Sequence, residues 1–237
     1  MSLTEKGLNI PALWERKRKL VEQTQGLTID RGTETFADIG GQEQIKQHGS
    51  AIATGPMAPR LYVRLEEIEK MTAGANSPVG DNTGVSQDAQ GVMLNSMEDN
   101  GWTGLIAVGP PGSGKSIFSK AVANTYGKLS ATLDFGAAKG GIVGQSEGYI
   151  RNVVKTFQAI GGDRVCFVAT CNSADTLPPA LLRRFKMGIW FFDLPNAAEK
   201  DSIWAIHIVK FGIKDNVRPN DEGWTGAEIR NCVELAW

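Results

Sequence analysis

The sequence predicts an α/β fold, in which a five-stranded parallel sheet is flanked by helices and followed by a small helical subdomain. Short apolar runs rich in β-branched residues alternate along the chain with helical patterns. This alternation is typical of parallel strands that are joined by helical crossovers and covered on both faces. A length of 237 residues with 41% hydrophobic residues is sufficient for one core of this kind with an appendage.

Most of the predicted strands are continuously apolar, and they cover 61–65, 105–108, 131–133, 165–170 and 189–192. Helical periodicity is found in the segments 87–97, 116–126, 146–159, 179–184, 197–211 and 225–237. A first amphipathic helix covers 11–25 and ends at Gly26. Between Thr72 and Gly91 the chain is dense in Gly, Ser, Asn, Asp and Pro, which indicates a loop.

Charge and cysteine content argue against several classes of function. The net charge of −1 gives no long-range field that would select nucleic acid or an anionic membrane. The three cysteines lack metal-ligand spacing, and their odd number does not suggest a disulfide framework. No apolar stretch is long enough to span a bilayer, and the first residues lack the apolar region of a signal peptide. We therefore expect a cytoplasmic protein without membrane contact.

A glycine-rich turn follows the strand at 105–108 and opens the helix at 116–126. Residues 109–116 read Gly-Pro-Pro-Gly-Ser-Gly-Lys-Ser, which fits the phosphate-binding P-loop pattern in the strand and helix context that it requires. Glycines let the backbone fold closely around phosphate oxygens, and the following helix points amide donors at the anion. The sequence therefore predicts a nucleotide site at this turn, with ATP as the expected ligand.

The whole turn is expected to contact the nucleotide. Its first residues are Gly109, Pro110 and Pro111, and because proline lacks an N–H the amide donors must come from Gly112 onward. The donors that follow are those of Gly112, Ser113, Gly114, Lys115 and Ser116. Lys115 should reach the β- and γ-phosphates as a catalytic point charge, and the Ser116 hydroxyl should ligate Mg²⁺.

A P-loop hydrolase also needs an acid at the end of a neighbouring strand to hold Mg²⁺ and a carboxylate to activate water. Downstream of the turn, no apolar strand ends in two acids. Upstream, the strand at 61–65 is followed by Glu66 and Glu67. Glu66 would then lie near the metal and Glu67 near the attacking water. A charged helix start on a solvated face is the alternative interpretation of the same two residues.

Several separate motifs resemble those of the AAA+ ATPases, and of the AAA branch in particular, over nearly all of residues 36–237. Residues 36–41 (Phe-Ala-Asp-Ile-Gly-Gly) resemble that branch's opening motif beside the adenine. The resemblance implies nucleotide contacts from Asp38, Ile39 and Gly40. The turn 109–116 is similar to the Walker A loop. The segments that resemble the Val-Gly-Glu-Ser-Glu stretch, the sensor-1 strand and the arginine-finger segment are 143–147, 168–172 and 177–185.

The order of these motifs departs from the family. In the usual AAA chain the Walker B strand and its helix lie between the Val-Gly-Glu-Ser-Glu helix and sensor 1, whereas here Asp163 leads straight into the strand at 165–170. Residues 61–100 resemble the missing strand and helix, moved ahead of Walker A. Because parallel strands tolerate different chain connections, we expect a rearranged core with the same active site. Glu66 stands where the family generally has Asp.

The resemblance implies further catalytic residues. Asn172 would orient the attacking water against the γ-phosphate, although an isolated Asn is more often a turn residue. Arg183 and Arg184 match the positions from which AAA subunits insert a guanidinium into a neighbour's site. That role implies a ring of identical chains. Which of the two arginines acts stays open, and an exposed surface pair is the alternative.

The family's lid and pore imply three more expectations. His207 matches the family histidine near the ribose and adenine, and a histidine packed against the core is the alternative. Gly226 and Ala227 would pack near the base. Ile142 occupies the place where protein-threading AAA rings usually carry an aromatic residue that grips the substrate chain, which counts against a strong unfoldase.

The sequence thus predicts three regions: an N-terminal helix and arm over 1–35, an AAA+ nucleotide-binding core over 36–194, and a helical lid over 195–237 that is expected to be incomplete. The leading function is Mg²⁺-dependent ATP hydrolysis by a ring, with six subunits expected, that remodels a protein or a protein–nucleic-acid complex. One alternative is a nucleotide-gated scaffold with little hydrolysis. Another is a DNA-associated motor or loader, motivated by the basic run at 16–19, for which a solvated helix face is the simpler interpretation.

Overall fold

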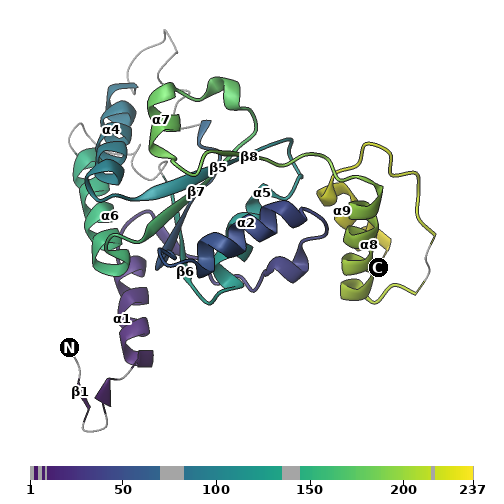
Figure 1. Cartoon of the computed structure of the whole chain (residues 1–237), viewed down its shortest axis with the longest axis horizontal. Helices are drawn as coiled ribbons and strands as arrows, with labels where there is room; N and C mark the ends of the chain where they lie inside the picture. The colour runs from purple at the N-terminus through teal and green to yellow at the C-terminus, as the bar shows by residue number, and fades with distance from the viewer. Residues whose placement is uncertain are drawn as a thin grey trace.

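The computed structural model of the chain describes residues 3–4, 7–8, 10–69, 83–134, 145–214 and 217–236. Its centre is a six-stranded sheet with the strand order β3-β6-β4-β7-β5-β8 (Figure 1). These strands are β3 (Leu27–Ile29), β4 (Leu61–Leu65), β5 (Thr103–Val108), β6 (Leu129–Leu133), β7 (Val165–Cys171) and β8 (Ile189–Phe191). A hairpin of β1 (Leu3–Thr4) and β2 (Gly7–Leu8) precedes the sheet.

The predicted α/β class is confirmed, and the sheet has one strand more than expected. The strands β4 to β8 pair in parallel, as the sequence predicted. At the edge, β3 pairs antiparallel with β6, so the sheet is mixed and not wholly parallel. Because β3 is only 3 residues long, no periodic pattern could reveal it.

Helices connect the strands and cover the sheet. Their bounds are α1 (Ile10–Glu22), α2 (Glu43–Thr54), α4 (Thr83–Asp99), α5 (Lys115–Asn124), α6 (Gln145–Gly161), α7 (Pro179–Arg184), α8 (Ala197–Phe211) and α9 (Gly226–Ala236). Short 3-10 turns lie at η1 (Phe36–Asp38) and η3 (Ala174–Thr176). The sequence analysis did not predict α2, although Ile45, Ile52 and Ala53 recur in it at helical spacing.

Each face of the sheet has its own apolar core, because side chains alternate along a strand. Leu61, Val63 and Leu65 of β4 belong to the core that includes residues of α4 and α6. Tyr62 belongs to the second core, together with Phe118 of α5. All residues of β4 are buried. The strand that carries the candidate acids is therefore fixed from both faces.

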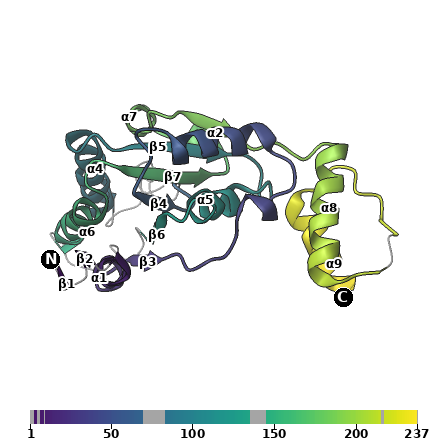
Figure 2. The ribbon, with the colours of Figure 1, turned by 60° about the horizontal axis from the view of Figure 1, so that its bottom comes forward.

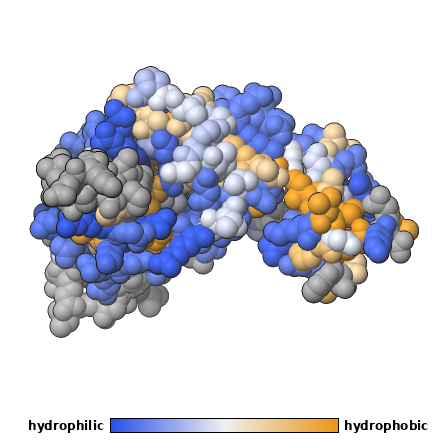
Figure 3. Space-filling model, turned by 90° about the horizontal axis from the view of Figure 1, so that it is seen from below, coloured by the Kyte–Doolittle hydropathy of each residue, from blue (hydrophilic) through white to orange (hydrophobic). Residues whose placement is uncertain are grey.

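The helices α8 and α9, called the lid below, lie side by side and apart from the sheet, at the end of the molecule opposite α4 and α6 (Figures 1 and 2). Their small core contains Ile203 and Trp204 from α8 and Ile229 and Val233 from α9. Hydrophobic surface gathers over this end of the molecule in Figure 3. In the described parts of the chain, no helix is long and apolar enough to cross a membrane.

Candidate nucleotide site

The P-loop connects the end of β5 to the start of α5. Gly112 has a φ of +80° and Gly114 a φ of +97°, both in the left-handed region that glycine adopts without a steric penalty. Gly114 is the N-cap of α5, so the loop turns directly into the helix. The first N–H groups of a helix have no partner within it and carry the positive end of its dipole. The turn therefore has the geometry of an anion site.

A cavity of about 310 Å³ lies over this turn. It is lined by the loop around residues 38–42, by the P-loop with the start of α5, and by the lid. The predicted site residues that it brings together are Asp38, Ile39, Gly40, Gly112, Ser113, Gly114, Lys115, Ser116, His207, Gly226 and Ala227. The residues that the sequence analysis missed are Gln42, Ile117, Pro195, Glu199, Ile203 and Arg230. The sequence could have indicated Arg230, because a residue one helical turn after Gly226 and Ala227 lies on the same face of the helix.

Lys115 is held at the floor of the cavity and is 7% exposed. Its Nζ donates to the carbonyl oxygen of Gly109 at 2.6 Å and to that of Pro110 at 2.8 Å. Gly109, Pro110 and Pro111 are not part of the cavity lining, so the first two act on the lysine and not on the cavity directly. Burial lowers the pKa of Lys115, and the negative charge of Glu69 opposes this shift.

The loop before α2 closes one side of the cavity. The carboxylate of Asp38 accepts hydrogen bonds from the backbone N and the Oγ1 of Thr35, at 2.8 and 3.0 Å, and so closes the turn of η1. Gly40 packs closely on the lid: a Cβ at this position would lie 2.6 Å from the backbone N of Ile203. Asp38 therefore shapes the wall of the cavity, and Gly40 allows the lid to approach it.

Two hydrogen bonds donated by backbone N–H groups join the lid to the rest of the site. The N–H of Ala227, in the first turn of α9, donates to the carbonyl oxygen of Gly112 at 3.3 Å. The N–H of Gln42 donates to Oε1 of Glu199 on α8 at 2.9 Å. The lid thus contacts both the P-loop and the loop before α2, and it lies over the site that they form.

His207 lines the cavity from α8 and is half-buried. Burial lowers the pKa of His207, and the positive charges of Lys210 and Arg230 lower it further. The opposing charges are those of Glu234 and Asp38. The imidazole is therefore in its neutral form at pH 7, in which one ring nitrogen can donate and the other can accept.

A turn that contains three acids follows β4. Glu66 and Glu67 are exposed, and Glu69 is half-buried. Glu67 has a φ of +51°, a left-handed conformation that is uncommon for a residue with a Cβ. The turn is bonded to the end of β7, because Thr170 accepts from the N–H of Glu67 through Oγ1 at 3.1 Å and from the N–H of Ile68 through its carbonyl oxygen at 2.9 Å.

The position of β4 brings this turn near the P-loop without placing it in the cavity. In the sheet only β7 separates β4 from β5, the strand that leads to the P-loop. All three strands are parallel, so their carboxyl ends meet at one edge of the sheet. The cavity lining nevertheless does not include Glu66, Glu67 or Asn172.

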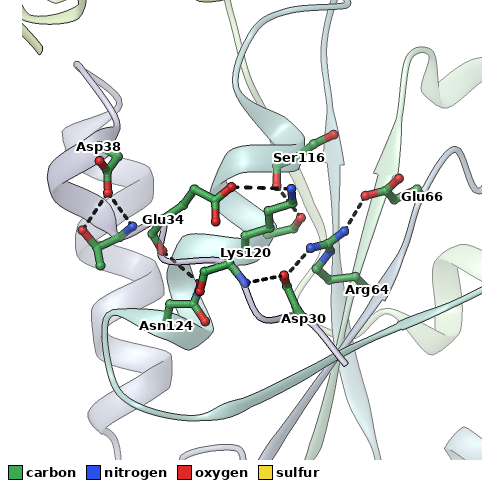
Figure 4. Close-up of polar contacts among 11 residues, drawn as sticks. Asp30, Glu34, Asp38, Arg64, Glu66, Ser116, Lys120 and Asn124 are labelled. Atoms are coloured by element: carbon green, nitrogen blue, oxygen red, sulfur yellow. Dashed lines mark hydrogen bonds and ion pairs between the residues drawn. The ribbon is translucent and has the colours of Figure 1, made fainter. Parts of the chain in front are cut away.

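Glu66 is paired with a buried arginine (Figure 4). Its Oε1 accepts from a terminal nitrogen of Arg64 at 2.6 Å, and the other terminal nitrogen of Arg64 is bonded to Asp30. The Arg64 residue is only 5% exposed, within a strand that the sequence analysis took as simply apolar. Figure 4 also shows that Asp30 belongs to a series of polar contacts that continues through Asn124 and Lys120 of α5. The sequence analysis did not anticipate this ion pair at the first acid.

Asn172 directly follows β7 and is bonded to an acid that the sequence analysis missed. Its backbone N and its Nδ2 both donate to Oε1 of Glu69, at 3.2 and 3.0 Å. A signal for Glu69 was present, because it is the third acid of the run Glu-Glu-Ile-Glu that begins at Glu66. The amide expected to orient water therefore has a carboxylate partner.

The two candidate arginines differ in their surroundings. Arg184 is bonded to Oε2 of Glu98 on α4 at 2.5 Å, and its side chain is 27% exposed. Arg183 is exposed. Neither lines the cavity of its own chain. Ile142, the segment 139–143 around it and the first residues of the segment 143–147 lie outside the described residues.

Residues 105–162 match the family model "ATPase family associated with various cellular activities (AAA)". An uncharacterized AAA domain-containing protein, ycf46 of Guillardia theta, is 23% identical over 280 residues, covering 97% of this chain and 49% of the relative. A proteasome-activating nucleotidase of Saccharolobus islandicus is 23% identical over 289 residues, covering 100% of this chain and 65% of the relative. The chain spans about half the length of the first of these relatives.

Solved structures show the same fold. The crystal structure of the FIGL-1 AAA domain has a TM-score of 0.53 at 16% identity and covers 97% of this chain and 80% of that one. The same domain in complex with ADP has a TM-score of 0.51, also at 16% identity, and covers 98% of this chain and 80% of that one. The predicted α/β fold is thus confirmed, and it is similar to the fold of the FIGL-1 AAA domain. The predicted enzyme class, an ATPase, agrees with the description of the family whose model residues 105–162 match.

Proposed function

We propose that this chain is a Mg²⁺-dependent ATPase that assembles into a ring and remodels a protein or a protein–nucleic-acid complex. The observation that carries the proposal is the cavity over the P-loop, with the buried Lys115 at its floor and the lid above it. A helix N-terminus suits the phosphates, and Ile39 and Ile203 offer apolar surface to a base. The family match, which includes the P-loop, supports nucleotide as the ligand.

The acids of this ATPase would be Glu66 and Glu67, placed ahead of the Walker A loop in the chain. The support is the position of β4, which is parallel to β7 and separated from β5 by that strand alone. An acid turn at the end of such a strand lies at the same sheet edge as the P-loop and Asn172. The left-handed conformation of Glu67 also supports a role, since strained backbone tends to occur at functional sites.

The residues at this edge fit Mg²⁺. The described residues contain no cluster of three or more His, Cys, Asp or Glu side chains that could hold a metal on its own. Mg²⁺ is usually held by one or two protein oxygens together with substrate phosphates, and the Ser116 hydroxyl and the Glu66 carboxylate are oxygen ligands of this kind. When bound, the ion would neutralise charge on the phosphates during transfer.

Each protein group would then have one task. Amide donors from Gly112 to Ser116 would bind the phosphates, and the Lys115 ammonium would contact the β- and γ-phosphates. The Glu67 carboxylate would take a proton from the attacking water, while Asn172 would orient that water. His207, Gly226 and Ala227 would contact the ribose and base from the lid side of the cavity.

The ring proposal depends on an arginine supplied by a neighbouring chain. Arg183 is the better candidate, because it is exposed, whereas Arg184 is ion-paired with Glu98 in its own chain. A guanidinium that reaches a neighbour's γ-phosphate would stabilise charge in the transition state. Six subunits, the regions 1–35, 36–194 and 195–237, and a cytoplasmic location remain predictions that accompany this proposal.

A second function is supported by the contact between Glu66 and Arg64. If the buried arginine kept this carboxylate from the metal, the chain would bind ATP with little hydrolysis and act as a nucleotide-gated scaffold. The structure does not support the alternative of a DNA-associated motor. Within the basic run 16–19, Arg18 is paired with Glu15, and Lys17 donates to the carbonyl oxygen of Ile160.

The test is phosphate release from ATP by the purified chain, measured against protein concentration with and without Mg²⁺. The proposal expects a rate per chain that rises with concentration and requires Mg²⁺, because the site is completed by a neighbour. Lys115→Ala is the control and should bind ATP weakly and release no phosphate. Tight ATP binding by the wild type without turnover at any concentration would contradict the ATPase and support the scaffold.

A further inference from the structure

The acid turn after β4 is fastened to the end of β7 at three consecutive positions. The N–H groups of Glu67 and Ile68 both donate to Thr170, a residue that is 4% exposed. At the next residue of the turn the direction of donation reverses: Glu69 accepts from Asn172, two residues after Thr170, through one carboxylate oxygen. The two segments are therefore held in one fixed register.

The bonds to Glu69 determine which way the Asn172 amide faces. A carboxylate can only accept hydrogen bonds, so the amide must present its Nδ2 and not its Oδ1 to Glu69. The backbone N of Asn172 donates to the same Oε1, which restricts the side-chain torsions as well. The Oδ1 atom, an acceptor, consequently faces away from Glu69. An acceptor in this position is what a water molecule needs if it is to be held by one of its own hydrogens.

Glu69 is also electrostatically coupled to the P-loop. Among the charged groups that act on Lys115, Glu69 contributes most, and it opposes the effect of burial on the pKa of the lysine. The carboxylate that fixes Asn172 therefore also acts electrostatically on the lysine that would bind the γ-phosphate. This links the end of β4, the end of β7 and the P-loop through one side chain.

We propose that Glu69 is a positioning residue for ATP hydrolysis, which orients Asn172 so that its Oδ1 holds the attacking water. The inference rests on the proposed ATPase function and assigns a residue that the acid pair Glu66 and Glu67 does not include. The cavity lining does not include Glu69, and the proposal gives this residue no contact with the nucleotide. Its effect is therefore on the rate of the chemical step and not on ATP binding.

The experiment compares Glu69→Ala, Asn172→Ala and the double variant with the wild type in single-turnover ATP hydrolysis, alongside the Kd of a fluorescent ATP analogue. We expect the rate to fall at least about tenfold in Glu69→Ala while the Kd changes less than about threefold. We expect the double variant to be no slower than Asn172→Ala alone, because both substitutions remove the same water contact. Glu69→Gln keeps an acceptor oxygen and should recover most of the rate.

Glu43→Ala is the matched control, since Glu43 is an exposed acid on α2 that is bonded to Lys46, and it should leave the rate unchanged. The side-chain amide ¹⁵N resonance of Asn172 reports on the surroundings of the amide independently of ATP hydrolysis. It should shift in Glu69→Ala but not in Glu43→Ala. Multiplying effects in the double variant, an equal loss of ATP binding, or an unmoved resonance would overturn the inference. Absence of turnover in the wild type would overturn the proposed function and this inference with it, whereas a normal rate in Glu69→Ala would overturn the inference alone.

Discussion

Arg64 shows how a single buried charge can depend on its partners. It lies in the middle of the sheet beside Asp30, and the two side chains are 6% and 9% exposed. A charge in such a place is costly unless it is paired, because little water remains to solvate it. The cost of removing one partner is therefore much larger for this pair than for an ion pair at the surface.

The variant Arg64→Met should lower the free energy of unfolding by about 3–5 kcal/mol, because it leaves the Asp30 carboxylate buried without its partner. Urea denaturation checks this. The control is Arg18→Met, whose contact with Glu15 joins side chains that are 53% and 61% exposed, and its expected cost is about 0–1 kcal/mol. Equal losses in the two variants would mean that the Arg64 pair does not stabilise the fold as described.

His207 gives a prediction that depends on pH. Its pKa in the folded chain lies below the ordinary value of 6.5, because burial and the nearby Lys210 and Arg230 disfavour the imidazolium. Between the two pKa values the unfolded chain binds more protons, so folding stability should fall as the pH drops below about 6.5. Titration of the ring by NMR measures the pKa, which should rise in Arg230→Gln. A ring that titrates above 6.5 would contradict the described surroundings.

At the scale of elements, the contact between the P-loop and α9 depends on a missing side chain. Gly112 has a left-handed φ of +80°, and a Cβ there would lie 2.7 Å from Oγ1 of Thr225 and 3.0 Å from the Cβ of Ala227. The first turn of α9 can therefore approach the P-loop only because residue 112 is glycine. Displacing the lid would open the side of the cavity where Gly226 and Ala227 lie.

Gly112→Ala should weaken ATP binding on the order of tenfold, through this displacement of the lid. Gly127→Ala is the control, because Gly127 also has a positive φ, of +58°, but a Cβ there would meet nothing within 4 Å. Both variants should lose about 1–2 kcal/mol of stability from the left-handed conformation. Calorimetric titration with ATP separates them, and equal affinities would show that the lid contact does not matter for binding.

The elements that the sequence predicted are those with long apolar runs or clear periodicity. β4 and α7 have the predicted bounds, and the other predicted strands agree within a few residues. β3 was missed because it is too short for a pattern, and α2 was missed although Ile45 and Ile52 recur in it at helical spacing. In the candidate site, the residues of the P-loop and three residues of the lid (His207, Gly226 and Ala227) were predicted, since their motifs are local. The lid residues Glu199, Ile203 and Arg230 were missed. The contacts of Glu66 with Arg64 and of Asn172 with Glu69 were not, since they arise only when distant segments pair.

At the scale of the whole molecule, the proposed ring predicts that inactive chains can complement one another. Arg183→Ala leaves the chain's own cavity intact and removes the group given to a neighbour. It should bind ATP normally but hydrolyse it on the order of 10³-fold more slowly. Lys115→Ala has the opposite defect: its own cavity is impaired, but it keeps the arginine that it gives to a neighbour.

A mixture of Arg183→Ala and Lys115→Ala chains should therefore recover a part of the wild-type phosphate release, because some sites combine an intact cavity with an intact arginine. The control is a mixture of Arg183→Ala with a chain that carries both Arg183→Ala and Lys115→Ala, and it should stay inactive. No recovery in the first mixture, with both variants shown to be folded by circular dichroism, would mean that Arg183 does not act between chains.

The strand order of the sheet supports the proposal that acids placed ahead of the P-loop in the chain can serve an ATP site. β4 precedes the P-loop in the sequence but takes a place beside β7 in the sheet, and its acids emerge at the edge where β5 and β7 also end. What determines the site is this spatial order of the strands. The central claim is therefore that the turn after β4 supplies the catalytic acid.

The most direct test of this claim is single-turnover ATP hydrolysis by Glu67→Gln beside the wild type, with ATP binding measured on the same samples. The substitution keeps the size of the side chain and one acceptor oxygen, and it removes the ability of the side chain to take a proton at neutral pH. The account predicts unchanged ATP binding and a rate lower by about 10²–10⁴-fold. A wild-type rate in Glu67→Gln would contradict it and show that the acids after β4 do not carry the reaction.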